Sequence, residues 1–213
     1  MLSPIRIDTV SALDAVLAIP GACPRFARDE EIFGEGERAD YVYQVVSGAV
    51  RTHRLLRDGR RQIDEFHFAG DYFGLELCET HRVTAEALCD ASVRLIRRGA
   101  LSDLAARRGD AAHAILRLTA EGLQRSQHHV LMLGRRSAME RVAGLLLDIA
   151  ERTHAQAELD VPMSRQDMAD YLGLTIETVS RTLTNLQDEG LIALPSVRHV
   201  VLKDRRALER MVA

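Results

Sequence analysis

Short apolar stretches alternate with turn signals in the first half of the chain, which is the pattern of β-strands. Stretches rich in β-branched or aromatic residues are predicted as strands at residues 41–46, 49–56, 61–68, 84–88 and 92–96. Asp58-Gly59 lies between two of them and favours a tight hairpin turn. Short strands separated by regular turn signals are typical of an all-β sandwich or barrel. We therefore predict a β-rich domain over residues 1–109.

From Asp110 onward the spacing of apolar residues becomes helical. Leu116, Leu123 and Val130 recur every seven residues, and no proline interrupts residues 110–136. A helix of that length would span about 40 Å, and a narrow apolar seam on so long a helix is typical of pairing with a second helix. We predict a dimer that forms through Leu116, Thr119, Leu123, Ser126, Val130 and Leu133. The alternative is that this stripe packs on the β domain of its own chain.

The remaining residues, 137–213, are predicted to form a separate module of short helices. Ser137 with Glu140 three residues later is a capping box, which predicts a helix that begins at residue 138. Its buried face is expected to consist of Ala138, Val142, Leu145, Leu146 and Ile149. Residues 153–161 are expected to be a polar connection.

A helix, a tight turn and a second helix are predicted between Ser164 and Gly190. Ser164 with Asp167 three residues later is a helix start signal. Gly173 is expected to end the first helix, and Thr175 is expected to cap the second. Two helices joined by so short a glycine-containing turn form the helix-turn-helix pattern.

The second of these helices divides into an apolar and a polar face. The buried side is predicted to consist of Ile176, Val179, Leu183 and Leu186. Glu177, Ser180, Arg181 and Thr184 fall on the opposite side. Arginine can donate two hydrogen bonds to guanine, glutamate can accept one from cytosine N4, and serine can serve either kind of base. We predict that Glu177, Ser180 and Arg181 read base edges in a major groove. The alternative is an ordinary surface ion pair between Glu177 and Arg181.

Two short strands at 191–194 and 199–202 are expected on either side of Pro195 and would form a β-wing. Residues 198–206 carry four basic side chains and one acidic side chain. Such groups can contact phosphates and so position a protein on a duplex. The predicted phosphate contacts are Ser164, Arg165, Thr175, Thr178, Arg198 and Lys203. A solvated run of charge is the alternative.

Composition restricts the class of protein. The chain has 213 residues, of which 46% are hydrophobic and 28% are charged, as in an ordinary packed soluble protein. No stretch approaches 18 uninterrupted apolar residues, and the N-terminus lacks the pattern of a signal peptide. We therefore expect a cytoplasmic protein without a membrane span. Because the net charge is −3, a DNA-binding function must rest on local motifs.

Enzymatic chemistry has little support in the sequence. Cys23, Cys78 and Cys89 are too few and too scattered for a disulfide framework or a metal knuckle. Clustered metal ligands, a Ser-His-Asp arrangement and a glycine-rich phosphate loop are not evident, so an enzyme is not expected.

The order of β-rich domain, long helix and winged helix-turn-helix resembles the Crp/Fnr superfamily of bacterial transcription regulators. The resemblance covers residues 20 to 205 approximately. It is carried by Val46-Ser47-Gly48-Ala49-Val50, by residues 68–74 and 163–173, and by Glu177-Thr178-Val179-Ser180-Arg181. The Glu-x-x-Ser-Arg form is similar to the Fnr and FixK branch.

This resemblance implies an α+β fold. It would consist of an N-terminal β jelly roll like a cyclic-nucleotide-binding domain, a long dimerisation helix and a C-terminal winged helix-turn-helix. It also implies a homodimeric activator on a palindromic TTGA-N-TCAA-type site, with Glu177, Ser180 and Arg181 as base readers. RNA polymerase would be contacted through the hairpin at 57–60 and the loop at 154–162.

The sequence departs from the members that bind cyclic AMP, which carry Phe-Gly-Glu and a later Arg-Ser-Ala or Arg-Thr-Ala. Here Leu75 follows Gly74 and Glu76 comes one place late, while Val83 takes the place of the arginine and Arg82 comes one place early. A one-residue offset on a strand turns a side chain to the opposite face. A pocket for a cyclic phosphate is therefore not expected.

Other cofactors of the family are not expected either. Three cysteines cannot supply the four thiolates of an iron–sulfur cluster. The histidines of the first half form no pair with useful ligand spacing for haem; they are His53, His67, His81 and His113. We therefore expect a FixK-like regulator that needs no cofactor. Cysteine oxidation is one possible modulator of such a regulator. A regulator gated by a cyclic nucleotide or another small ligand remains the alternative.

Overall fold

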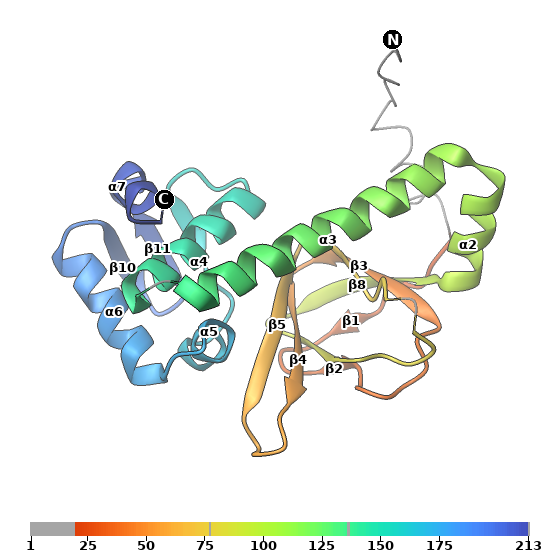
Figure 1. Ribbon diagram of the computed structural model, residues 1–213, viewed down its shortest axis with the longest axis horizontal. Coiled ribbons are helices and arrows are strands. Elements are labelled where there is room, and N and C mark those ends of the chain that lie inside the picture. Colours follow the sequence, from red (N-terminus) through yellow and green to blue (C-terminus); the bar gives the residue numbers. More distant parts are fainter. Residues whose placement is uncertain (1–19, 77, 136, 213) are drawn as a thin grey trace, which may run out of the picture.

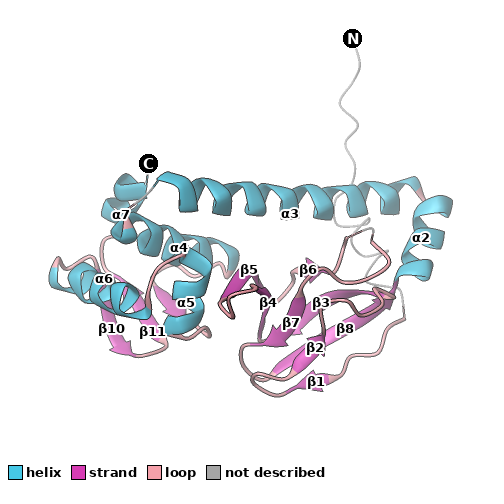
Figure 2. Ribbon diagram, turned by 60° about the horizontal axis from the view of Figure 1, so that its bottom comes forward, coloured by secondary structure: helices cyan, strands magenta, loops and turns pink. Residues whose placement is uncertain are grey.

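The computed structural model describes residues 20–76, 78–135 and 137–212 of the chain. A β-rich body and a helical body lie along one long helix, α3 (Gly109–Arg135), which passes both of them (Figure 1). Figure 2 shows the same helix from a second direction, with the two bodies side by side beneath it. The helix lies within one residue of the predicted 110–136 at each end.

Two four-stranded antiparallel sheets form the N-terminal body. The first sheet has the order β1 (Arg25–Phe26), β8 (Ala91–Arg97), β3 (Tyr41–Ser47) and β6 (Tyr72–Phe73). The second sheet has the order β2 (Glu31–Phe33), β7 (Thr84–Ala87), β4 (Ala49–Leu55) and β5 (Arg61–Phe68). Side chains of both sheets, among them Val45 and Val50, pack together as a core. All five strands predicted from the apolar pattern are present, as is the β-rich character of this domain.

Strands β4 and β5 form the hairpin that extends toward the C-terminal body. Their register runs from Ala49 opposite Phe68 to Leu55 opposite Arg61. At the tip Gly59 has a φ of +83°, and its N–H donates to the carbonyl of Leu56 over 2.9 Å. The hairpin turn predicted at Asp58-Gly59 is therefore confirmed.

The C-terminal body contains four helices and a small sheet. Its helices are α4 (Ala138–Arg152), α5 (Arg165–Leu172), α6 (Ile176–Asp188) and α7 (Arg205–Val212). The predicted capping box of α4 is present, since Glu140 accepts from Ser137 N over 2.7 Å and Ser137 Oγ accepts from Glu140 N over 3.3 Å. The predicted inner face of α4 is buried except for Ala138, which is only half-buried.

The wing is a three-stranded sheet and differs from the prediction in two ways. Its order is β10 (Ile192–Ser196), β11 (His199–Leu202) and β9 (Glu158–Asp160), so the connection expected to be merely polar contains a strand. Pro195 lies inside β10 instead of between the two strands. This is tolerated because β10 is an edge strand whose register shifts between Ala193 and Ser196, and prolines in sheets occur at edges and bulges.

Two helices were not predicted from the sequence. One is α7, and the other is α2 (Arg98–Arg107), which follows β8 directly. Arg97 at the start of α2 makes no side-chain capping hydrogen bond, so the usual start signal is missing. Asp204 does cap α7, since its carboxylate accepts from Ala207 N over 2.9 Å, and this signal could have revealed that helix.

The two bodies share one apolar core. Ile63 and Phe66 of β5 belong to the same buried cluster as Leu146 of α4 and Tyr171 of α5. The rings of Phe66 and Tyr171 lie 4.9 Å apart. Burial of this kind stabilises by roughly 25 cal/mol for each Å² of apolar surface. The C-terminal body is thus packed firmly against the hairpin.

Within the described residues, none of the helices combines the length and the apolar character that crossing a bilayer requires.

Candidate nucleic-acid interface

Helix α6 presents the predicted polar face to solvent. Glu177, Ser180, Arg181 and Thr184 are all exposed. Behind them Val179, Leu183 and Leu186 are fully buried, as predicted. The helix is therefore held by its inner face while its outer side chains stay available to a ligand. We call Glu177, Ser180 and Arg181, which the sequence predicts as base readers, the base-reading face.

Ile176 corrects one part of the predicted buried stripe. It is the first residue of α6 and is 39% exposed, because it stands at the helix start where the core no longer covers it. Thr182, which the sequence did not single out, is buried on the inner side instead.

The start of α6 keeps the acid of the base-reading face ionised. Thr175 Oγ1 caps the helix by accepting from Thr178 N over 3.2 Å. The pKa of Glu177 is lowered because its carboxylate accepts from its own backbone N–H at the helix start and from the Thr175 hydroxyl. An ionised carboxylate is the form that accepts a hydrogen bond from cytosine N4. In the part of the chain that the structure describes, no ion pair joins Glu177 to Arg181 directly, although the nearby charge of Arg181 is a further, smaller cause of the lowered pKa of Glu177.

The predicted phosphate contacts fall into an exposed and a half-covered group. Thr175, Arg198 and Lys203 are exposed, and Arg198 and Lys203 lie on the wing. Arg165 is half-buried, and its guanidinium lies 3.5 Å from the sulfur of Met168. Burial lowers the pKa of Arg165, which nevertheless stays charged at neutral pH.

Ser164 and Thr178 serve mainly as internal partners. Ser164 Oγ donates to Asp167 over 2.7 Å, and the backbone N–H of Ser164 donates to the same carboxylate over 2.8 Å. This is the predicted start signal of α5, here in the form of a full capping box. The hydroxyls of Thr178 and Thr175 lie 3.1 Å apart and bond to one another.

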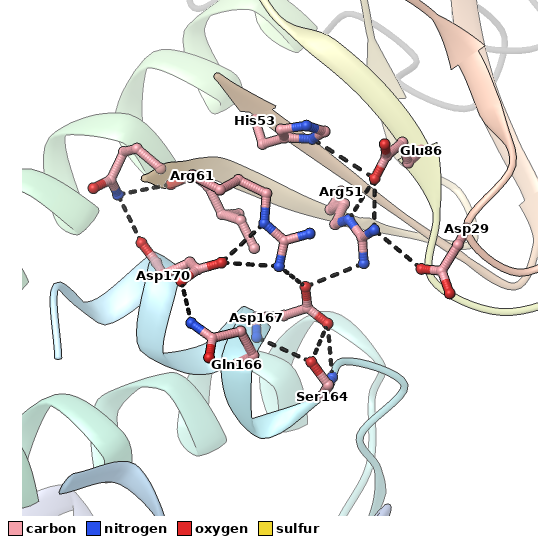
Figure 3. Close-up of polar contacts among 11 residues, drawn as sticks. Asp29, Arg51, His53, Arg61, Glu86, Ser164, Gln166, Asp167 and Asp170 are labelled. Atoms are coloured by element: carbon pink, nitrogen blue, oxygen red, sulfur yellow. Dashed lines mark hydrogen bonds and ion pairs between the residues drawn. The ribbon is translucent and has the colours of Figure 1, made fainter. Parts of the chain in front are cut away.

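Helix α5 is tied to the β4–β5 hairpin by a set of ion pairs that sequence reasoning missed. We call this set the interdomain ion cluster; its members are Asp29, Arg51, Arg61, Glu86, Asp167 and Asp170 (Figure 3). No local signal could reveal it, because Arg51 and Asp167 are separated by 116 positions in the chain. Its effect is to place the helix-turn-helix against the β domain.

The predicted seam of α3 is largely uncovered in the single chain. Leu116, Leu123 and Val130 are 65%, 59% and 67% exposed. Thr119 and Ser126 are also exposed, whereas Leu133 is half-buried beside the helix-turn-helix. Apolar residues that stay exposed at heptad spacing argue against the alternative in which this stripe packs on its own β domain.

A cavity of about 330 Å³ lies between the β domain and α3. Val83 lines it, whereas Arg82 is exposed to solvent outside it. Glu76 lines it too but is engaged by His81, whose Nδ1 lies 2.7 Å from the carboxylate. The cation on its wall, Arg125, is paired with Glu65. These residues do not fit a cyclic phosphate, which needs an unengaged cation.

Two buried histidines of the β domain each bond to a hydroxyl group within the fold, although His67 Nδ1 has no hydrogen-bond partner among the described residues. His67 Nε2 lies 3.2 Å from the Thr52 hydroxyl, and His81 Nε2 lies 3.4 Å from the Tyr43 hydroxyl. Among the residues that the structure describes, no group of three or more histidine, cysteine or acidic side chains is arranged to hold a metal ion.

Comparison with known proteins agrees with this geometry. Residues 140–211 match the Crp-like helix-turn-helix domain family, and residues 24–108 match the cyclic nucleotide-binding domain family. The chain is 49% identical to the nitrogen fixation regulation protein FixK of Azorhizobium caulinodans, over 99% of this chain and 87% of that protein. It is 40% identical to FixK of Rhizobium meliloti, over 98% of this chain and 95% of that protein. These relatives are regulators and not enzymes, as expected from the sequence.

The fold is similar to that of solved structures as well. FixK2 from Bradyrhizobium japonicum superposes with a TM-score of 0.88 at 46% identity, covering 92% of this chain and 98% of the other. A Crp-family regulator of Thermus thermophilus superposes with a TM-score of 0.73 at 34% identity, covering 89% and 96%.

Proposed function

The chain belongs to the FixK-like branch of the Crp/Fnr superfamily, whose members are transcription regulators with a helix-turn-helix DNA-binding domain, and we propose that it activates transcription as a cofactor-free homodimer. Its target is a palindromic TTGA-N-TCAA-type site, and its further partner is RNA polymerase. The observation that carries the proposal is the exposed base-reading face, which is held by a buried apolar stripe directly behind it.

Base selection rests on the chemistry of three neighbouring side chains. Arg181 donates to guanine O6 and N7, while the ionised Glu177 accepts from cytosine N4. The two lie one helical turn apart, so they address one G·C pair or two neighbouring pairs. Ser180 is placed between them and serves as a second donor or acceptor. Together they select the half-site.

Phosphate contacts would fix the helix in the groove. The exposed Thr175 stands at the start of α6, and Arg198 and Lys203 extend from the wing. Ser164, Arg165 and Thr178 are half-covered, so their contribution would come from the helix starts that they border.

Dimerisation would come from the exposed seam of α3. Two copies paired along Leu116, Leu123 and Val130 would bury apolar surface that one chain leaves in water. A two-fold dimer presents two copies of α6 to half-sites about 34 Å apart, one turn of the duplex. This symmetry is the reason for proposing a palindrome.

Independence from a cofactor is supported by the cavity beside α3. Its acidic lining and the engaged Glu76 and Arg125 disfavour a cyclic phosphate. The amount of protein would then set the activity. RNA polymerase would be contacted by the hairpin tip at 57–60, which is exposed, and by the loop at 154–162.

Selection of bound duplexes from a random pool tests the proposal. The full chain would be incubated with the pool in the absence of effectors and in the presence of cyclic AMP or cyclic GMP. Enrichment of a two-fold palindrome with TTGA and TCAA arms under all conditions is expected. Enrichment of unrelated sequences, or enrichment only with a nucleotide present, would overturn the proposed site or the cofactor-free state respectively.

A further inference from the structure

Two arginines of the β domain converge on one carboxylate of the helix-turn-helix. Arg61 Nη2 donates to Asp167 Oδ1 over 2.5 Å, and Arg51 Nη1 donates to the same atom over 3.1 Å. Arg61 also contacts Asp170 Oδ2, over 2.9 Å from Nε and 2.8 Å from Nη2. Figure 3 shows both guanidinium groups directed from the strands toward the first turn of α5.

Arg51 is itself held by partners within the β domain. Arg51 Nε donates to Glu86 Oε2 over 2.9 Å, and its Nη2 donates to Asp29 Oδ1 over 3.0 Å. Arg51 is 7% exposed and Asp167 is 3% exposed. Charged groups that are buried to this extent must stay paired. A buried charge without a partner has lost its hydration and gains no ion pair in return. The Arg51 guanidinium is therefore fixed in direction before it reaches α5.

Asp167 links the fixed position of the arginines to the position of α6. Its Oδ2 accepts from both the N–H and the hydroxyl of Ser164, so the carboxylate that meets the arginines also starts α5. Only residues 173–175 separate α5 from α6. Because the turn is this short and the two helices pack together, fixing the direction of α5 fixes that of the base-reading face.

The ion cluster is better suited to set orientation than to add stability. The apolar contact between Phe66 and Tyr171 already binds the two bodies, and it is non-directional. Buried ion pairs add little net stability, and in some proteins they select one arrangement over its alternatives. Four carboxylates surround two guanidinium groups here, so the loss of either arginine leaves carboxylates that repel one another across the contact.

We propose that Arg51 and Arg61 are positioning residues that hold α6 in its DNA-binding direction without a ligand. The inference rests on the proposed function. It adds to that function an explanation of how a chain without a cofactor keeps α6 in the direction that binds DNA. A chain in which the interdomain ion cluster is broken populates several directions of α6. Its apparent affinity then falls in proportion to the fraction that remains competent.

Charge reversal in the full chain tests this inference. Arg61→Glu is compared with Arg54→Glu, the same charge reversal at an exposed arginine of the same hairpin that is paired with Glu35. Binding is measured by gel shift on the palindrome and on palindromes with one base pair added to or removed from the centre. Sedimentation and thermal unfolding are measured in parallel, to verify the dimer and the fold.

Arg61→Glu is expected to weaken binding to the palindrome by about tenfold. It is also expected to reduce the preference for one spacing, because α6 is no longer held in one direction. Arg54→Glu should keep both properties. The reciprocal variant Arg61→Glu/Asp170→Arg restores an ion pair of opposite sense and should recover most of the affinity and the spacing preference.

Two results would overturn the inference. One is an Arg61→Glu variant with wild-type affinity and spacing preference. The other is an equal loss in Arg54→Glu with no recovery in the reciprocal variant, since this would show a general effect of charge on DNA binding. A wild-type chain that fails to bind the palindrome would instead refute the proposed function, so the two failures are distinguishable.

Discussion

His129 of α3 and Tyr171 of α5 stack face to face, with ring centroids 3.8 Å apart and planes 5° from parallel. His129 Nε2 also lies 2.7 Å from the carbonyl oxygen of Tyr171, so the ring donates a hydrogen bond to the helix-turn-helix. The helix that carries the exposed seam is thereby bonded directly to the body that carries the base-reading face. Whatever pairs with α3 is coupled to the position of α5.

Replacing Arg181 with alanine tests the assignment of base reading. We expect the free energy of specific binding to weaken by about 1–3 kcal/mol, because a bidentate contact to guanine is lost. Choice at the G·C position should relax, while binding to random duplex changes little. Gel shifts on a panel of single-base variants would measure both effects.

Gln187→Ala is the matched control for that variant. Gln187 is also exposed on α6, but it lies ten residues and about 15 Å beyond Glu177 along the helix. An Arg181→Ala variant that loses the same affinity on every duplex in the panel would contradict base reading.

Leu123→Asp is expected to dissociate the dimer. A carboxylate placed in a paired apolar seam is buried without a partner, which disfavours association strongly. Gln124→Asp introduces the same charge one position along the helix, about 100° around its axis, and should leave the dimer intact. Sedimentation velocity would compare the two masses. A dimer that survives Leu123→Asp would contradict this seam.

Stability should fall as the pH drops below the ordinary histidine pKa of 6.5, because buried histidines resist protonation. Burial lowers the pKa of His67, of His53 and of His129 in the folded chain. Below pH 6.5 the unfolded chain binds protons that the folded chain does not, so the free energy of unfolding decreases. Each such histidine contributes a slope of up to about 1.4 kcal/mol per pH unit.

Urea unfolding between pH 7.5 and 5.5 measures this slope. His67→Gln removes one titrating group from the same buried position, so its free energy of unfolding should depend less steeply on pH than that of the wild-type chain. The comparison uses slopes and is insensitive to a uniform loss of stability in the variant. If the free energy of unfolding depends on pH equally steeply in the variant and the wild-type chain, His67 does not titrate in this way.

Two glycines with the same backbone conformation are expected to respond differently to alanine. Gly48 and Gly59 have φ angles of +81° and +83°. A Cβ on Gly48 would lie 2.5 Å from the carbonyl oxygen of Asp90, whereas one on Gly59 meets nothing within 4 Å. Gly59→Ala should cost only the backbone strain, about 1 kcal/mol. Gly48→Ala should cost more, and thermal unfolding would rank them; equal losses would refute the packing argument.

Cyclic nucleotides are expected not to bind. Val83 stands where the phosphate would need a guanidinium, and the cavity wall carries Glu76 and Glu65. Calorimetric titration with cyclic AMP and cyclic GMP should therefore give no binding heat at concentrations well above those of a specific complex. Saturable heat with one of them would support the alternative of a nucleotide-gated regulator.

Local signals predicted the elements that place the site. The pairs Ser137 with Glu140 and Ser164 with Asp167 form the capping boxes that the sequence indicates, and Thr175 caps α6. These features depend only on residues three positions apart, so they can be predicted from the local sequence alone. The exposed side of α6 follows for the same reason, since helical spacing alone separates its faces.

Contacts between distant segments could not be predicted in this way. Strand β9 has three residues and exists because it pairs with β11, some 40 positions later. Arg51 occupies an ordinary place in a predicted strand, and only the folded chain shows that its partner is Asp167. Ile176 has the spacing of a buried residue but stands where the core ends. Each of these features depends on tertiary packing, which the periodicity of apolar residues along the chain does not reveal.

The apolar core that joins Phe66 to Tyr171 should make the two bodies unfold as one cooperative unit. A fragment cut at the start of α4 would leave the Tyr171 side of that core in water, and the remaining β domain would expose Ile63 and Phe66. Both pieces would then expose apolar surface to water and tend to aggregate. Although the two halves match separate domain families, they should therefore unfold together.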